Sequence, residues 1–198
     1  MIYVIILIIF FVICLYLVTL RKEKKEIILI KCQNNMSYSS TTIANYFVRN
    51  YSKYGDLTPM KLIKMTYLAY SWYLALTNGE KKLIQERLEA WDYGPVFPKL
   101  YQNIKNFGKI KINDTIPSNT EEIIDVDDAK FLDKIWSMYG KFDGVQLSAM
   151  THTDNTPWKN SYCYGCNSQI EDEKILEHYL PKLKSTTEEK QSENKTVV

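Results

Sequence analysis

One segment of the chain is apolar nearly all round, which predicts that it lies at the centre of its domain. Thr58 and Pro59 are typical of a helix start, because threonine can cap the first turn and proline suits a position whose N–H has no partner. Residues 60–76 then carry only two charges, Lys61 and Lys64. A helix without a polar face is surrounded by other elements. We therefore expect a core helix in a mainly helical domain.

Most of the remaining periodicity is also helical. Apolar residues recur three and four positions apart in several further segments, each with its own start or stop signal. These helices are predicted from Ser39 or Ser40 to the stop at Gly55, from Phe97 to Phe107, from Asp127 or Asp128 to Tyr139, from Gly144 to about Met150, and after a possible capping box formed by Ser168 and Glu171.

One segment has the alternation of a strand. Between Leu83 and Trp91, apolar and polar residues partly alternate, which predicts a short strand followed by a turn at residues 92–95. A second, weaker strand is predicted at residues 109–112. The expected fold is therefore mainly α with a minor short β element, in a single compact helical domain at residues 39–184. Residues 185–198 are too polar to bury much surface, which predicts a disordered tail.

The N-terminus of this 198-residue chain is a hydrophobic segment. Residues 1–20 contain no charged side chain and are long enough to cross a bilayer as a helix. Basic residues follow the segment and none precedes it, which argues against a cleavable signal peptide and predicts a cytoplasmic C-terminal end. The domain would then hang from the inner face of the cell membrane through a linker at residues 21–38. Alternatively, translation starts at Met36, residues 1–35 are leader sequence, and the domain is soluble in the cytoplasm.

Composition and motifs argue against nucleic-acid and nucleotide partners. The formal net charge is only +2, whereas nucleic-acid binders usually show a clear basic excess. Neither a G-x-x-x-x-G-K-[ST] nor a G-x-G-x-x-G motif occurs, and the chain holds only 7 glycines. We expect no nucleic-acid partner and no cofactor.

Two clusters contain residue types that could do chemistry. Cys163-x-x-Cys166 could be half of a zinc site, with only His152 and His178 as plausible further ligands, so zinc is a weak alternative. His152 also has Asp154 nearby, which is the pairing that a hydrolase would need. No recognisable nucleophile motif accompanies it, and a hydrogen-bonding structural histidine at a helix end is the favoured interpretation.

The turn around Trp91 is rich in aromatic residues. Residues 89–98 read E-A-W-D-Y-G-P-V-F-P and pack Trp, Tyr and Phe around two prolines and a glycine. Trp and Tyr are over-represented at binding hot spots, but they also fill cores. The residues alone leave both roles open.

The same segment resembles a known family. Together with Leu100 and Tyr101 it is similar to the E-A-W-x-Y-G-P-V-x-P-x-L-Y signature of the Panacea antitoxin domain, the SocA-like or GepA-like family. The stretch L-T-P-M-K-L-I-K-M-T-Y at residues 57–67 resembles the family's L-T-x-x-K-L-x-K-L-x-Y helix, and L-S-A-M-T-H at residues 147–152 with P-W at 157–158 resembles its third block. Asp92 departs from the pattern, since Lys or Arg is frequent there.

The resemblance implies a binding protein rather than an enzyme. Members are antitoxins that neutralise a cognate protein toxin, several are phage-associated, and one branch delivers its toxin to a cytoplasmic protease. The alternatives are the hydrolase using His152 and Asp154, or a membrane-tethered scaffold without a toxin. The residues expected to frame or brace the toxin-binding surface are Trp91, Tyr93, Pro95, Phe97, Tyr101, Thr151, His152 and Trp158.

Overall fold

The computed structural model describes residues 37–118 and 122–195. The chain divides into two units, Met1–Met36 and Ser37–Val198, and the first lies entirely outside the described residues. The expected transmembrane or leader helix at residues 1–20 and nearly all of the linker at 21–38 are therefore not described. Within the described ranges, no helix is both long and apolar enough to cross a membrane.

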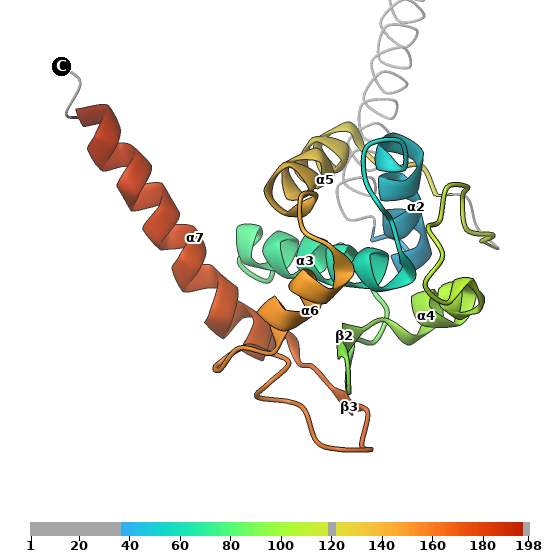
Figure 1. The fold of residues 1–198 in the computed structure, drawn as a ribbon. Coiled ribbons are helices and arrows are strands. Elements are labelled where there is room, and N and C mark those ends of the chain that lie inside the picture. Colours follow the sequence, from blue (N-terminus) through green and yellow to red (C-terminus); the bar gives the residue numbers. More distant parts are fainter. Residues whose placement is uncertain (1–36, 119–121, 196–198) are drawn as a thin grey trace, which may run out of the picture. The chain divides into compact units, whose positions relative to one another are not determined.

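The described domain is mainly α with a small sheet, as the sequence predicts (Figure 1). The sheet has three short antiparallel strands in the order β2-β1-β3. In chain order the elements are α2 (Ser40–Tyr51), α3 (Pro59–Leu76), β1 (Glu89–Trp91), β2 (Gly94–Val96), α4 (Pro98–Ile104), the 3₁₀ turn η1 (Lys105–Phe107), α5 (Val126–Tyr139), α6 (Gly144–Thr151), β3 (Ser168–Gln169) and α7 (Asp172–Lys195).

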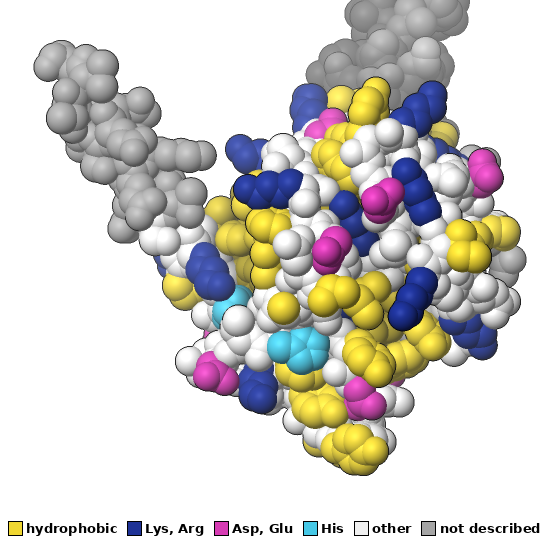
Figure 2. Space-filling view, viewed as in Figure 1, with side chains coloured by type: hydrophobic (Ala, Val, Ile, Leu, Met, Phe, Trp, Pro, Cys, Tyr) yellow, Lys and Arg dark blue, Asp and Glu magenta, His cyan; other side chains and the backbone are white. Residues whose placement is uncertain are grey.

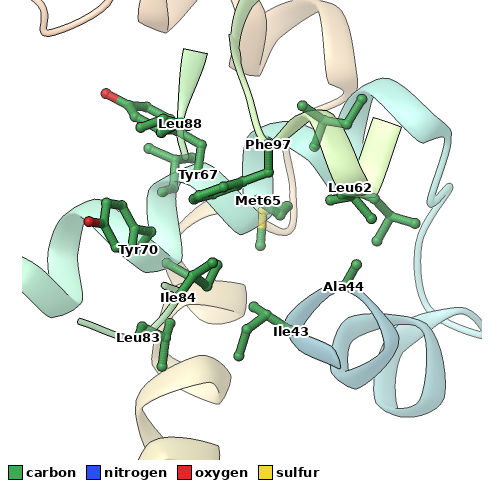
Figure 3. Close-up of a cluster of buried hydrophobic side chains, with 14 of the residues drawn as sticks. Ile43, Ala44, Leu62, Met65, Tyr67, Tyr70, Leu83, Ile84, Leu88 and Phe97 are labelled. Carbon is green, nitrogen blue, oxygen red and sulfur yellow. The ribbon is translucent and has the colours of Figure 1, made fainter. Parts of the chain in front are cut away.

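Helix α3 is the core helix that its composition predicts. Thr58 caps it by accepting a hydrogen bond from the Lys61 N–H, and the other helices of the domain surround it (Figure 1). Its side chains Leu62 and Met65 are fully buried, and Figure 3 shows them in one cluster with Ile43 of α2. Burying a large apolar side chain stabilises a fold by about 1.5–3 kcal/mol, so this cluster is a main source of stability.

Aromatic rings join α3 to α7. The Tyr179 ring lies edge-on to Trp72, with ring centroids 5.0 Å apart, and also edge-on to Tyr67 at 6.4 Å. The Trp72 indole N–H donates to the Tyr139 hydroxyl at 2.8 Å, so the polar end of this ring is also satisfied. These contacts fix the N-terminal half of α7 against the core.

Local capping residues set where α5 and α6 begin. Asp143 accepts from the N–H groups of Val145 and Gln146, and Gln146 accepts in return from the Asp143 N–H, which is a complete capping box. Helix α5 is capped by Asp125, two or three residues before the predicted start, because the Asp125 side chain accepts from the Asp127 N–H at 2.9 Å. The predicted caps at 127 and 128 lie in the first turn instead.

The strand predicted over residues 83–91 is regular only from Glu89 onward. Its first part pairs elsewhere, because Ile84 forms an isolated bridge with Tyr38, whereas β1 pairs with β2 and β3. The predicted turn at residues 92–95 is also shorter than expected. Gly94 pairs with Trp91 in the β1–β2 hairpin, so only residues 92 and 93 form the turn.

Two further local predictions are wrong. Residues 109–112 form no strand, and Ile112 makes a single backbone hydrogen bond to the Leu57 carbonyl. Ser168 caps no helix, because it lies in β3 opposite Ala90. Helix α7 starts at Asp172.

The C-terminal stretch differs from its expectation as well. Its composition predicts a disordered tail from residue 185, whereas α7 continues past Pro181 to Lys195. Extending an existing helix costs far less than starting one, and Glu, Lys and Gln are good helix formers. A segment too polar to bury surface can therefore still lengthen a helix that already exists.

Candidate partner-binding surface

The β1–β2 hairpin presents an aromatic side chain at its tip. The tip consists of Asp92 and Tyr93, and the Tyr93 side chain is 74% exposed. Among the residues that the structure describes, none makes a hydrogen bond or ring contact with that side chain, although the backbone beneath it is held from several sides. The tip therefore combines a fixed main chain with a free aromatic ring.

A buried lysine supports the hairpin from below. Lys64 of α3 is 2% exposed, and its ammonium donates to the Pro95 carbonyl at 3.1 Å. Gly94 makes room for this contact, since a Cβ at that position would lie 2.6 Å from Lys64 Nζ. Gly94 also has φ +105°, a conformation that L side chains rarely adopt. Burial lowers the pKa of Lys64 to about 7.

Helix α6 holds the tip from one side. The Ser148 hydroxyl donates to the Tyr93 carbonyl at 2.9 Å. Thr151, one turn later, is buried and donates to the Ser148 carbonyl at 2.7 Å. The L-S-x-x-T-H block thus supports the hairpin through its serine, while its threonine lies beneath Gly94.

Three neighbouring rings hold the tip from the end of α6 and the loop that follows it. The ring centroids of His152 and Trp158 lie 3.8 Å apart. The Tyr162 ring stacks on that of Trp158 with a centroid distance of 4.7 Å. Each ring has a polar atom near the hairpin. Trp158 Nε1 donates to the Trp91 carbonyl at 2.8 Å, the Tyr162 hydroxyl donates to the Asp92 carboxylate at 2.8 Å, and His152 Nε2 lies 3.3 Å from the Asp92 carbonyl.

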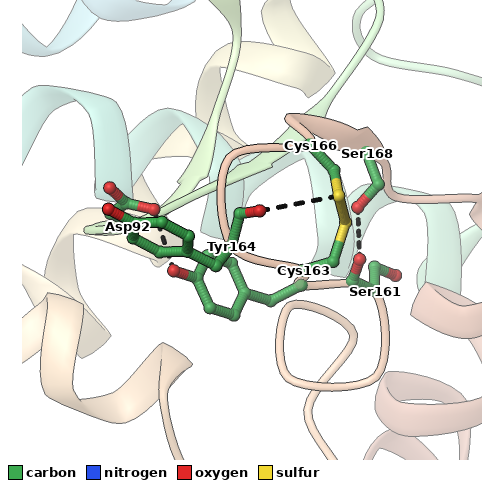
Figure 4. The surroundings of a disulfide bond; sticks show 7 residues. Asp92, Ser161, Cys163, Tyr164, Cys166 and Ser168 are labelled. Carbon is green, nitrogen blue, oxygen red and sulfur yellow. Dashed lines mark hydrogen bonds between the residues drawn. A yellow bond between two sulfur atoms is a disulfide. The ribbon is translucent and has the colours of Figure 1, made fainter.

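A disulfide follows directly after Tyr162 in the same loop (Figure 4). Cys163 and Cys166 are bonded to each other, whereas the sequence suggests at most a pair of zinc ligands. Neither sulfur is then free to bind zinc. Across the described ranges, no group of three or more His, Cys, Asp and Glu side chains is placed to hold a metal ion. His178 interacts with the Asn155 carbonyl instead.

A cavity of about 440 Å³ opens between α3, the hairpin and the end of α4. Trp91 and Tyr101 contribute to its wall, with their rings edge-to-face at a centroid distance of 4.9 Å. The size is within the range of small ligand pockets. Its other lining residues are Pro59, Met60, Ile63, Lys64, Asp92, Tyr93, Val96, Lys105, Gly108 and Asn167.

The eight residues expected at the surface fall into two groups. Tyr93 is exposed, and Trp91, Tyr101 and His152 are half-buried, so a partner can reach these four. The others are buried and support the hairpin or the core. These buried residues are Pro95, Phe97, Thr151 and Trp158.

The structure does not bring the hydrolase pair together. His152 Nδ1 lies 2.6 Å from the Ser148 carbonyl, and its other nitrogen faces the Asp92 carbonyl. Within the described part of the chain, no hydrogen bond joins the His152 ring to Asp154, which is exposed. The ring is held as the structural histidine that the sequence favours.

Sequence reasoning missed three residues of this arrangement. Ser148 and Lys64 both belong to the recognised motifs, but their roles depend on contacts with the distant hairpin. Lys64 had a usable signal, because a lysine inside an otherwise apolar helix must find a partner or line a cavity. Tyr162 gave no such signal.

The fold and site define a small, mainly helical domain that presents a supported aromatic hairpin. Residues 62–159 match the sequence model of a family described as "Antitoxin SocA-like, Panacea domain", and this stretch belongs to that family. The resemblance seen in the motifs is thereby confirmed. Comparisons with curated proteins and with solved structures found no match. The family supports a role in a toxin–antitoxin system in general terms, and it suggests a non-enzymatic one.

Proposed function

We propose that this chain is the antitoxin of a toxin–antitoxin pair and that it neutralises its cognate toxin by direct binding. The binding surface, here called the tip surface, consists of Tyr93, the cavity rim at Trp91 and Tyr101, and the exposed residues Val145 and Met150 of α6. The family match supports the antitoxin role, and the geometry of the hairpin supports the location.

The observation that carries the location is the exposure of Tyr93 on a fixed backbone. Its carbonyl is held by Ser148, and the neighbouring Trp91 carbonyl is held by Trp158. A partner that covers this ring therefore orders one side chain and no loop, which keeps the entropic cost of binding low. Tyrosine in that setting is a common hot-spot residue.

Further apolar side chains are exposed close to the tip. Val145 is 71% and Met150 38% exposed on α6, whose first residue, Gly144, abuts Met60 at the cavity wall. Figure 2 shows hydrophobic side chains gathered beside histidine on one face of the domain. Exposed apolar groups that cluster mark interaction sites more often than isolated ones. A standard interface needs roughly 800 Å² on each partner, which a domain of this size can supply.

A growth-rescue assay tests the proposal. The chain would be co-expressed with its cognate toxin, and growth would be compared between Tyr93→Ala and Tyr164→Ala. Both tyrosines are highly exposed, Tyr164 at 87%, but Tyr164 lies outside the tip surface. We expect Tyr93→Ala to lose rescue and toxin binding while circular dichroism stays unchanged, and Tyr164→Ala to keep both. Equal rescue by the two variants would show that the tip surface is not the binding site.

The amount of toxin distinguishes two routes of neutralisation. If binding blocks the toxin directly, immunoblots should show the same toxin level with and without the antitoxin, together with a stable complex. If the antitoxin delivers the toxin to a protease, the level should fall and recover in a protease-deficient host. We propose the direct route, because the supported hairpin is suited to stable binding.

A further inference from the structure

Lys64 has an unusual environment for a charged side chain. Lysine is almost never fully buried unless it is paired. In the described structure no carboxylate lies within ion-pair distance of Lys64, and the Pro95 carbonyl is the single acceptor that contacts its ammonium. An ammonium has three N–H donors, so this protein contact uses one of them.

This lysine also lines the cavity beneath the tip. The other cavity residues include one further cation, Lys105, whose ammonium donates to Gln102 at 2.6 Å and is exposed. The one acidic side chain in the lining is Asp92, and it already accepts from the Tyr162 hydroxyl. The local charge balance of the cavity therefore favours an anion.

The hydrogen bond to Pro95 supports the hairpin, but it does not by itself account for a charged group at this buried position. Removing a charged group from water is costly, and replacing a buried charge by an apolar side chain of similar size is often neutral or stabilising. A methionine in place of Lys64 would fill about the same volume and would also fit beside Gly94. A lysine held here at a cost to stability is better suited to meeting a negative group on a ligand.

The shape and lining of the cavity indicate what carries that group. Met60, Ile63, Trp91 and Tyr93 give it apolar and aromatic walls, and Tyr93 belongs to the tip surface as well. An apolar segment that carries one carboxylate could cover the apolar walls and also pair with the Lys64 ammonium. A free small acid would leave most of the apolar wall uncovered.

We propose that the cavity receives an acidic side chain, glutamate or aspartate, from an apolar segment of the toxin, and that the Lys64 ammonium is its counter-ion. This inference rests on the proposed function and adds the chemistry of the toxin's anchor. A charge-assisted hydrogen bond in a half-enclosed cavity is roughly twice as strong as a neutral one. The anchor therefore contributes specificity in addition to the apolar contact around Tyr93.

A peptide titration tests the proposal without any toxin. The full chain would be titrated with the probes N-acetyl-Phe-Glu-Leu-amide and N-acetyl-Phe-Gln-Leu-amide, which differ only in charge. Trp91 lines the cavity and its indole N–H donates to Glu89, so the NMR signal of this N–H is used to report occupancy. We expect the glutamate probe to bind about tenfold more tightly than the glutamine probe.

Matched variants assign that preference to one lysine. Lys64→Met should remove the preference for the glutamate probe, while Lys99→Met should keep it, since Lys99 is exposed on α4 and lies outside the cavity lining. Equal binding of the two probes to the wild-type chain would overturn the proposal, and so would a preference that survives in folded Lys64→Met. If Lys64→Met does not fold, the comparison on the wild-type chain decides.

Three further outcomes keep the proposals separate. If free glutarate binds as tightly as the glutamate probe, the occupant is a small acid and the proposed protein anchor is wrong. If the probes fail but toxin rescue still depends on Tyr93, the acidic anchor is rejected and the antitoxin function stands. Loss of the Tyr93 dependence with intact probe binding would reject the tip surface instead.

Discussion

The indole N–H of Trp158 donates to the main-chain carbonyl of Trp91 at 2.8 Å, across 67 positions of sequence. This bond joins two motifs that look independent in the sequence, the aromatic turn and the P-W pair. It shows that the second motif supports the first. The tip surface therefore depends on two segments that lie far apart in the sequence. A substitution that disrupts either segment should change the position of Tyr93.

Trp158→Phe tests this support directly. The ring and most of its packing remain, but the donor to the Trp91 carbonyl is lost. We expect the free energy of unfolding in urea to fall by about 1–2 kcal/mol, because a partly buried acceptor loses its partner. Tyr162→Phe, which loses a hydrogen bond at an exposed position, should cost less. Equal losses would mean that the Trp158 bond has no special role.

Gly94→Ala should be much more destabilising than Gly108→Ala. Both glycines have positive φ, +105° and +57°, so alanine is strained at each by about 1–3 kcal/mol. Only at Gly94 would the new Cβ also meet the Lys64 ammonium, whereas nothing lies within 4 Å of it at Gly108. We expect a further loss of about 1–3 kcal/mol at Gly94, measured by urea unfolding. Similar values for both variants would contradict the observed contact.

Lys64 should give the protein a distinct dependence on pH. Its pKa is about 7 in the folded chain against an ordinary 10.5, so between these values the unfolded chain binds the proton more readily. The free energy of unfolding should therefore rise with pH over this window, by about 1 kcal/mol per unit for one such group. Below about pH 7 the lysine is charged in both states, and its contribution to the slope vanishes.

Urea unfolding between about pH 7 and pH 9 measures this slope. The window ends there because burial raises the pKa of Tyr67 to about 12, and such tyrosines reverse the trend once the unfolded chain begins to lose their protons above about pH 10. Lys64→Met should be flatter than the wild type and more stable at pH 7. The same slope in both proteins would show that Lys64 is not the group responsible.

The disulfide should contribute little to the stability of the domain. Cys163 and Cys166 are three residues apart and exposed, so the bond restricts the unfolded chain less than one closing a long loop. We expect Cys163→Ser with Cys166→Ser to lower the free energy of unfolding by about 2 kcal/mol or less and to keep toxin rescue. Loss of rescue in a folded double variant would assign the loop a role in binding.

Local signals in the sequence predicted much of the fold. Thr58 and Pro59 set the start of α3, and the apolar residues after them predicted its central position, because capping and periodicity depend on neighbouring residues alone. The sheet was harder, since the partners of Ala90 come from β2 and from Ser168 in β3, which lies far along the chain. Ser168 was assigned to a helix cap for the same reason, as no nearby residue reveals a strand partner.

The candidate surface was predictable in its residues but not in their roles. The aromatic composition around Trp91 pointed to the segment, yet it could not separate exposed Tyr93 from buried Phe97. That distinction depends on the fold, because Tyr93 lies in the turn of the hairpin whereas Phe97 lies between β2 and α4, where it is buried in the core. The role of Lys64 depends on a contact with Pro95, 31 positions away.

The hairpin is held mainly through main-chain atoms. The carbonyls of Trp91, Tyr93 and Pro95 accept from Trp158, Ser148 and Lys64, and a carbonyl is the same in every residue. These three hydrogen bonds do not involve the side chain of Tyr93. Evolution can therefore exchange the residue at this position, and with it the partner recognised, while the scaffold that displays it stays unchanged.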